Sequence, residues 1–415
     1  MTVPLTLPPK KDPQKRTRVP TLPPAARSRA ALGLTAAAAE GRFALQRCAD
    51  CGAVQYPPRD SCQQCLSVDL AWAAMPSGAT VLAETRIHAS PDPYFRERLP
   101  WRIGTVQLDA GPVAVCHLHG DVGRGARVQM ALKLDKAGQG VLIALPAERT
   151  EAMEDDPTLR ALTAHPRHRR VLITDMRAPE ALPLVRALLA EGAARVFVGE
   201  AESWRRWPGR AAFEALERVE IVPLDVTDAA SVARLAGEIG GKTDILINTA
   251  RHVRPGGVVG QDTVAARDGI EVNVLGLMRL AQGFGPAMAG RSEDGTNAAV
   301  AFLNILSAHA LAPDPSFGAF AAGQAAARSL CQTLRGEFAP AGLRVMAVYC
   351  GPTEDEWHQP LPPPKVSPAA LARGVVEALV EGIEDSFVGD VARDVAERWR
   401  RDAKVLEREL AGGGA

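Results

Sequence analysis

Between residues 80 and 145, short segments of the chain alternate apolar and polar positions and are bounded by Gly, Pro or Asp. Such alternation predicts strands with one buried face, and a closely spaced series of them predicts a small antiparallel barrel of the OB type. We expect strands at Thr80–His88, Trp101–Leu108, Val113–Leu118, Arg127–Leu134 and Gly140–Leu145.

From about residue 168 onward, short apolar runs alternate with longer segments of helical period. This order predicts a doubly wound parallel sheet of the Rossmann type. We expect strands at Arg170–Thr174, Arg195–Val198, Ile221–Asp225, Asp244–Asn248, Ala299–Leu306 and Arg344–Tyr349. We expect helices at Ala181–Glu191, Ser231–Ile239, Ala265–Ala281 and Phe317–Phe338, and a mostly charged amphipathic helix over Pro368–Leu410.

The remaining segments set the domain boundaries. Residues 1–29 are basic and rich in proline, which predicts a disordered arm. Residues 30–148 then hold an N-terminal helix, a cysteine-rich segment and the barrel, and residues 149–168 are expected to be a linker. The doubly wound domain is expected over residues 169–400, followed by a tail at 401–415. The amphipathic segment Ala392–Leu410 is a candidate assembly surface, with a solvated helix as the alternative.

Four cysteines form the most specific chemical motif of the chain. Two Cys-x-x-Cys knuckles, separated by ten residues, consist of Cys48, Cys51, Cys62 and Cys65. Four thiolates can close a tetrahedron around Zn²⁺ and leave no open position for water, so the motif predicts a structural zinc ribbon. Two disulfides, or four unrelated cysteines, are the alternatives.

Composition narrows the classes of function. The 48 basic residues balance the 48 acidic ones, so there is no global charge that favours nucleic acid or an acidic membrane surface. The cysteines outside the knuckles, Cys116, Cys331 and Cys350, lie in apolar runs, which suits a reducing cytoplasm. No apolar run is long enough for a membrane helix, and the N-terminus lacks the apolar segment of a secretory signal.

Residues 40–148 resemble the acyl-CoA-associated zinc-ribbon and OB-fold family. The resemblance is carried by the knuckles followed by Tyr56-Pro57-Pro58-Arg59, Trp72, Ser77-Gly78-Ala79-Thr80-Val81, Pro100-Trp101 and Val106-Gln107-Leu108-Asp109-Ala110-Gly111. Members of that family are typically partners of thiolase-type or other acyl-CoA enzymes and help to bind or channel the CoA thioester. The resemblance therefore implies a role that depends on a partner subunit.

Residues 168–400 resemble the short-chain dehydrogenase/reductase family. The matching positions are Asp225-Val226-Thr227-Asp228, Asn248-Thr249-Ala250, Asn273, Ser307 and Gly351-Pro352-Thr353. The resemblance implies that Asp225 could accept the adenine amino hydrogen and that Asn248 could tie neighbouring backbones together at a strand end. It likewise implies that Ser307 could hold a substrate carbonyl. The alternative is that these residues only maintain the fold.

The cofactor loop departs from the family pattern. Relatives end the first strand in Thr-Gly-x-x-x-Gly-x-Gly, whose glycines let the backbone approach a pyrophosphate. Here Asp175, Pro179 and Ala181 replace the three glycines, and Asp175 and Glu180 carry negative charge. Repulsion between like charges costs on the order of 1 kcal/mol or more per pair. We therefore expect NAD(P) binding in the usual pose to be severely weakened.

The catalytic pair is also replaced. Relatives carry Tyr thirteen residues after the Ser and Lys four residues later, where this chain has Phe320 and Gln324 after Ser307. Phe320 has no proton to give and Gln324 has no charge, so we expect no catalysis by this route. A new nucleophile built from Ser307 or Cys350 with His309 or His252 is the alternative to purely structural histidines.

These observations together predict a non-catalytic scaffold subunit of a thiolase-type, acyl-CoA-processing complex, assembled as a homo- or hetero-oligomer. The alternative is an NAD(P)-dependent 3-hydroxyacyl-CoA dehydrogenase whose site a partner completes. A nucleic-acid module is a third reading, which the balanced charge disfavours.

Overall fold

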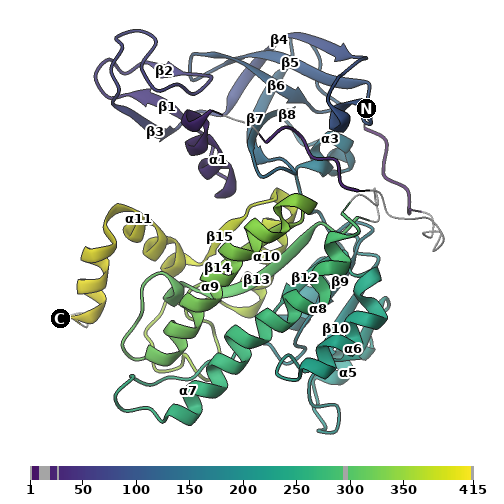
Figure 1. The fold of residues 1–415 in the computed structure, drawn as a ribbon, viewed down its shortest axis with the longest axis vertical. Coiled ribbons are helices and arrows are strands. Elements are labelled where there is room, and N and C mark those ends of the chain that lie inside the picture. The colour runs from purple at the N-terminus through teal and green to yellow at the C-terminus, as the bar shows by residue number, and fades with distance from the viewer. Residues whose placement is uncertain (1, 9–18, 26–27, 293–297, 413–415) are drawn as a thin grey trace. The chain divides into compact units, whose positions relative to one another are not determined.

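The structure is a computed structural model that describes residues 2–8, 19–25, 28–292 and 298–412 (Figure 1). The chain divides into two compact units, the first built mainly from Pro20–His165 and the second mainly from Pro166–Val380 and the segment from Asp385. Within the described ranges, no helix has the length and apolar character needed to cross a membrane.

The first unit begins with a short helical segment and a small sheet. A turn of 3₁₀ helix at Arg29–Ala31 leads into α1, Leu32–Ala39, which is the N-terminal helix expected from the sequence. Three antiparallel strands follow in the order β2-β1-β3. These strands are β1 (Ala44–Cys48), β2 (Val54–Gln55) and β3 (Leu70–Ala74). The turns around this sheet hold the two cysteine knuckles.

A closed five-stranded barrel with the order β4-β5-β6-β8-β7 completes the first unit, which confirms the OB-type prediction. Its side chains alternate between buried and exposed, as in β6. The strands are β4 (Gly78–Ile87), β5 (Trp101–Leu108), β6 (Val113–Leu118), β7 (Arg127–Leu134) and β8 (Gly140–Pro146). The helical segments are α2 (Pro93–Arg96), the 3₁₀ turn Met153–Asp155 and α3 (Pro157–Ala161).

The segment expected to be a linker, residues 149–168, is partly folded onto the barrel. It contains α3, and the side chains of Leu159 and Leu162 pack with Ile143 of β8 in one buried cluster. Asp156 caps α3 by accepting a hydrogen bond from the backbone N–H of Leu159 at 2.9 Å. The helix cap and the apolar contacts therefore order part of residues 149–168, although their composition predicted a linker.

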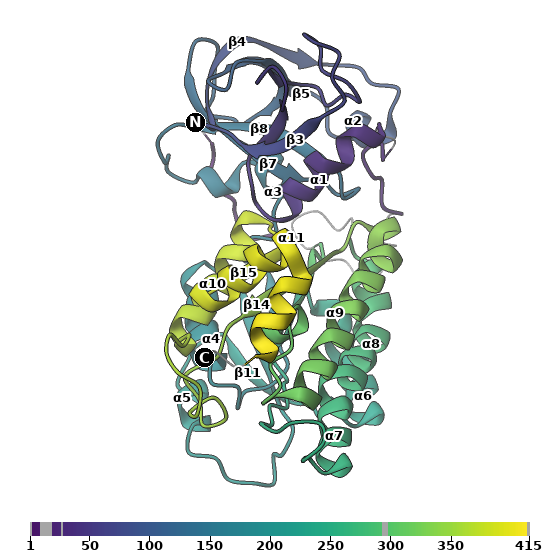
Figure 2. The ribbon, with the colours of Figure 1, turned by 90° about the vertical axis from the view of Figure 1, so that its left-hand side faces the viewer.

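The second unit is a seven-stranded parallel sheet with the order β11-β10-β9-β12-β13-β14-β15, which confirms the doubly wound prediction. Helices α6, α8 and α9 cover one face, and α4 and α10 cover the other (Figure 2). The strands are β9 (Arg170–Ile173), β10 (Arg195–Glu200), β11 (Val219–Pro223), β12 (Ile245–Asn248), β13 (Ala301–Ser307), β14 (Arg344–Cys350) and β15 (Asp385–Val388). The helices are α4 (Ala181–Ala190), α5 (Arg210–Glu214), α6 (Ala229–Ile239), α7 (Thr263–Ile270), the π-helix Glu271–Gly276, α8 (Leu277–Ala289), α9 (Gly318–Phe338), α10 (Pro368–Glu381) and α11 (Asp390–Ala411).

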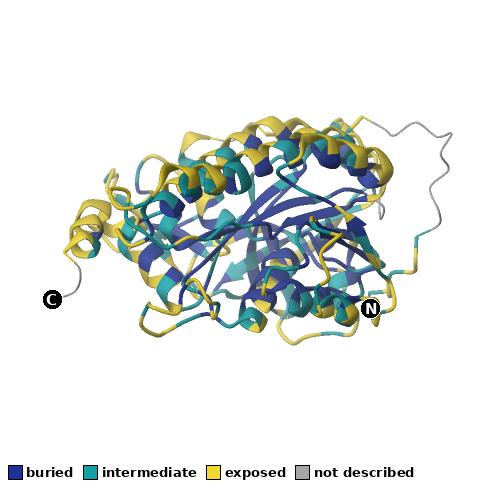
Figure 3. Cartoon of the chain, turned by 90° about the horizontal axis from the view of Figure 1, so that it is seen from below, coloured by how far each residue is buried: buried dark blue, intermediate teal, exposed yellow. Residues whose placement is uncertain are grey.

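Burial on both faces explains the uninterrupted apolar runs of this half. Val171, Leu172 and Ile173 of β9 are all 0% exposed, because helices cover the sheet on each side. In Figure 3 the central strands are buried while the outer faces of the helices are exposed. The carboxyl ends of the strands meet at one edge, where doubly wound folds place their ligands.

Two features differ from the sequence prediction near the C-terminus. The segment Pro368–Leu410 was expected to be mostly helical, but strand β15 interrupts it and pairs with β14 in parallel. The predicted domain boundary at residue 400 falls inside α11, whose Leu406 is 1% exposed and packs with Ala308 and Val395. Part of the expected tail is therefore packed against the domain.

Candidate functional site

The four knuckle cysteines converge as predicted. Their sulfur atoms all lie within 4.8 Å of one another, with Cys48 Sγ 3.5 Å from Cys65 Sγ and Cys51 Sγ 3.6 Å from Cys62 Sγ. A tetrahedron of Zn–S bonds of about 2.3 Å has S···S edges of about 3.8 Å, whereas a disulfide bond is about 2.05 Å. The set therefore fits Zn²⁺, and it does not fit two disulfides.

The knuckle backbone lowers the pKa of two of the four thiols, those of Cys48 and Cys62. The N–H of Gln64 donates to Cys62 Sγ at 3.4 Å. Hydrogen bonds from the backbone of Cys65 and Gln64 lower the pKa of the Cys62 thiol to about 6. A thiolate is the form that ligates zinc, so at Cys62 the turn geometry favours the ligating state.

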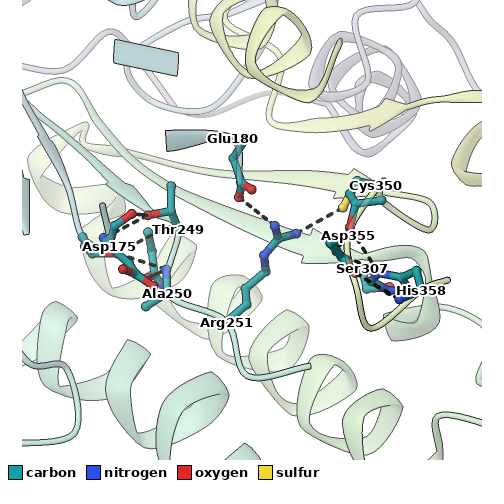
Figure 4. Close-up of polar contacts among 12 residues, drawn as sticks. Asp175, Glu180, Thr249, Ala250, Arg251, Ser307, Cys350, Asp355 and His358 are labelled. Atoms are coloured by element: carbon teal, nitrogen blue, oxygen red, sulfur yellow. Dashed lines mark hydrogen bonds and ion pairs between the residues drawn. The ribbon is translucent and has the colours of Figure 1, made fainter. Parts of the chain in front are cut away.

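Arg251 occupies the edge of the sheet where the second unit would hold a cofactor. It follows Asn248-Thr249-Ala250 after β12, and its Nη2 donates to Glu180 Oε1 at 2.7 Å. Its Nη1 lies 3.3 Å from Cys350 Sγ at the end of β14 (Figure 4). The side chains of Arg251 and Glu180 are only 11% and 1% exposed. A buried ion pair therefore spans the carboxyl ends of neighbouring strands.

Glu180 is the residue that precedes the first turn of α4. In dinucleotide-binding folds the N–H groups and dipole of this helix end bind the pyrophosphate. Here a buried carboxylate lies at that end and is neutralised by Arg251. An ion pair of the protein therefore lies at the helix end where such folds bind a phosphate.

The loop before Glu180 is rigidly bonded. The N–H of Asp175 donates to Thr249 Oγ1 at 3.0 Å, and Thr249 Oγ1 donates back to the carbonyl of Asp175 at 3.1 Å. Asp175 Oδ1 accepts from the N–H of Arg177 at 2.8 Å. Burial raises the pKa of the Asp175 carboxyl above its ordinary value. Pro179 occupies the second glycine position of the family motif. Ala181 occupies the third and is fully buried.

Phe320 and Gln324, which stand where the family carries its catalytic Tyr and Lys, are packed in the interior. Phe320 is 4% exposed and its ring centroid lies 6.2 Å from that of Phe317 and 6.2 Å from that of His309. Gln324 is 1% exposed, and its Oε1 accepts from the backbone N–H of Ser307 at 2.8 Å. Neither side chain offers an ionisable proton beside Ser307.

Two further predicted residues tie the fold together. Asn273 accepts from the N–H of His252 and donates to its carbonyl, both at 2.9 Å. Asn248 accepts from Thr174 Oγ1 at 2.9 Å and donates to Asn304 Oδ1 at 3.3 Å, which links β12 to both of its neighbours.

Asp225 is engaged by its own turn. Its Oδ1 accepts from the backbone N–H and the hydroxyl of Thr227 at 2.8 and 2.7 Å, and its N–H donates to Ser231 Oγ. The geometry therefore accounts for this residue as a turn former, and its cofactor role stays a prediction.

The proposed nucleophile pairs are not assembled. Ser307 and Cys350 are register partners in β13 and β14, but the contact of Ser307 with His309 comes from the backbone N–H of His309 at 3.2 Å. Burial raises the pKa of the Cys350 thiol, which keeps it protonated, and burial lowers the pKa of His309. His252 meets Asn273 only through its backbone groups.

Sequence reasoning missed two groups in this region. One is Arg251, although a charged residue directly after Asn248-Thr249-Ala250 was a usable signal. The other is the pair Asp355 and His358, whose i, i+3 spacing places the Asp355 carboxylate 2.9 Å from Nδ1 of the ring. His358 stacks on Phe317, with ring centroids 5.4 Å apart.

Family models match three parts of the chain. A model described as the ChsH2 rubredoxin-like zinc ribbon domain matches residues 35–71, and the ChsH2 C-terminal OB-fold domain matches residues 72–133. The short chain dehydrogenase model matches residues 171–365.

Individual relatives are likewise described as short-chain dehydrogenases or oxidoreductases. The chain is 32% identical over 142 residues to the short-chain dehydrogenase PC-15 of Penicillium crustosum, an alignment that covers 33% of this chain and 49% of that protein. It is 29% identical over 143 residues to the uncharacterized oxidoreductase YjdA of Bacillus subtilis (strain 168), covering 34% and 55%. The chain thus spans about half the length of these curated relatives.

A solved short chain dehydrogenase from Burkholderia cenocepacia J2315, described in complex with NADP, is 29% identical, with a TM-score of 0.52. The alignment covers 58% of this chain and 96% of that one. The chain therefore joins a ChsH2-type zinc ribbon and OB-fold domain to a domain of the short chain dehydrogenase family.

Proposed function

We propose that the chain is a non-catalytic accessory subunit of a thiolase-type, acyl-CoA-processing complex. In this proposal the zinc ribbon and barrel contact the partner enzyme, and the dehydrogenase-like unit is a scaffold that binds no NAD(P) in the usual pose. The buried ion pair between Arg251 and Glu180 is the observation that carries the proposal.

The charge at the first turn of α4 supports this interpretation of the second unit. A diphosphate at the first turn of α4 would face the Glu180 carboxylate, whose side chain is 1% exposed and already has its cation. Binding would require breaking that pair inside the protein, which costs about 3–5 kcal/mol. Such a penalty weakens binding by more than a hundredfold.

The second unit also lacks a proton donor at the positions where relatives carry their catalytic pair. Phe320 and Gln324 are both buried, and Gln324 is held by the backbone of Ser307. A carbonyl substrate near Ser307 would therefore receive no proton from the positions that relatives use. The function of the chain is then best sought in what it binds.

Two measurements test the proposal. Calorimetry of the full chain with NADPH and with NADH is expected to give no micromolar binding. Affinity purification from the native host, followed by mass spectrometry, is expected to recover an acyl-CoA enzyme in stoichiometric amount. Purification of the Cys62→Ala variant serves as the control, because disrupting the ribbon should abolish capture. Recovery of no acyl-CoA enzyme would rule the partner role out.

A second candidate is an NAD(P)-dependent 3-hydroxyacyl-CoA dehydrogenase that a partner completes. The likeness to a dehydrogenase described in complex with NADP favours it. It requires Arg251 to leave Glu180 when the partner binds, so adding the purified partner should then produce NADPH binding and turnover of a 3-oxoacyl-CoA. The scaffold role predicts neither.

A further inference from the structure

A cavity of about 220 Å³ lies within the first unit, between α2, α3 and the barrel strands β5, β6 and β8. Its apolar lining includes Phe95, Trp101, Val141 and Leu162. Most of its lining is apolar, although three polar residues also line it: His117, Asp135 and Thr158. A mainly apolar cavity of this size favours a hydrocarbon occupant over water, which needs polar partners.

The aromatic wall is held rigidly. The ring centroids of Tyr94 and Phe95 are 5.2 Å apart, and those of Phe95 and Trp101 are 5.3 Å apart, both in edge-to-face arrangement. The indole N–H of Trp101 donates to Nδ1 of His117 at 3.1 Å. Because that bond uses the one polar group of the indole, Trp101 presents only its apolar surface to the cavity.

The proline-rich arm forms another wall. Pro23, which is buried, and Pro24 both line the cavity. The segment is fastened at Thr21, whose hydroxyl accepts from Arg98 at 3.2 Å and donates to Glu97 at 2.9 Å. The described part of the predicted disordered arm at 19–25 thus has a defined place on the barrel, although it forms neither helix nor strand.

We propose that this cavity binds the hydrocarbon end of an acyl group. A cavity of about 150 Å³ holds benzene, so in proportion 220 Å³ accommodates about nine carbons, either a chain or a ring with a short chain. The identification of the ligand as an acyl group rests on the proposed function, whereas the affinity of the cavity for hydrocarbon does not.

Calorimetric titration of the full chain with 1-butanol, 1-hexanol and 1-octanol tests the cavity without any CoA. Burial of each methylene is expected to raise the affinity about fourfold. An affinity that does not change along the series would overturn the inference. Octanoyl-CoA is then compared with acetyl-CoA, and at least a tenfold preference for octanoyl-CoA is expected. Alkanol binding without that preference would retain the cavity and reject the acyl identity of its ligand.

A matched pair of substitutions locates the binding. Val141→Phe fills the cavity and is expected to abolish the dependence on chain length, whereas Val115→Phe, at a position on β6 that is 58% exposed, should leave it unchanged. Zinc content and the melting temperature report whether each variant is folded. If Val141→Phe does not fold, Ala161→Leu on α3 fills the same cavity. Dependence retained in a folded, filled variant would refute this site.

Discussion

Replacing Arg251 with Met tests our proposal that its ion pair with Glu180 closes the cofactor edge of the second unit. The change removes the cation that lies 2.7 Å from Glu180 and leaves a carboxylate that is 1% exposed without a counter-charge. Breaking a buried pair in this way costs about 3–5 kcal/mol. For a domain of this size, that loss lowers the melting temperature by roughly 6–20 °C.

The same reasoning predicts strong coupling between the two positions. Replacing both Arg251 and Glu180 with Met removes both charges, and that double variant should be close to the parent chain in stability. Denaturant unfolding of the parent, both single variants and the double variant gives the coupling energy. Arg195→Met is the matched control, because its ion pair with Glu220 is about half exposed and is worth less than about 1 kcal/mol. A loss at Arg251 no larger than at Arg195 would refute the closed-edge interpretation.

Replacing Cys62 with Ala should remove the one zinc ion expected per chain and, with it, about 10–16 kcal/mol of apparent binding energy. Metal analysis should then find no zinc, and the ribbon should unfold. The control variant Cys116→Ala should keep its zinc. Restoring Tyr at Phe320 together with Lys at Gln324 should yield no NADPH-dependent turnover of acetoacetyl-CoA, because the ion pair that we propose excludes the cofactor is still present. Turnover by this double variant would contradict the proposal. Burial raises the pKa of the Asp355 carboxyl, but hydrogen bonds from a histidine and a threonine outweigh it and lower the pKa to about 2. Since the unfolded value is about 3.9, this carboxylate stabilises the fold above pH 4, and about 1–2 kcal/mol is lost between pH 4 and 2. Asp355→Asn should remove that part of the pH dependence in urea titrations.

The elements predicted correctly from the sequence are those in which the order of apolar and polar residues follows which side chains are buried. Strands β5, β6 and β7 have the predicted bounds, because alternation along a barrel strand follows its two faces. Strand β15 was missed because its four residues, Asp385–Val388, are too few to display a period between two helices.

The candidate sites divide in the same way. The zinc ligands were predictable because their spacing along the chain nearly determines their geometry. The direction of the Arg251 side chain, by contrast, depends on a partner 71 positions away, which no local pattern encodes. The aromatic cavity was missed for a related reason: its wall combines the N-terminal arm with α3, which the sequence reading placed in a linker.

The salt link between Arg251 and Glu180 also bears on how such a chain can evolve. A chain with an open phosphate site at this helix end would have to lack both opposite charges, and losing either one first leaves the other unpaired in the interior. Both orders of mutation therefore pass through an intermediate of lowered stability. The two residues are consequently expected to be gained or lost together rather than one at a time.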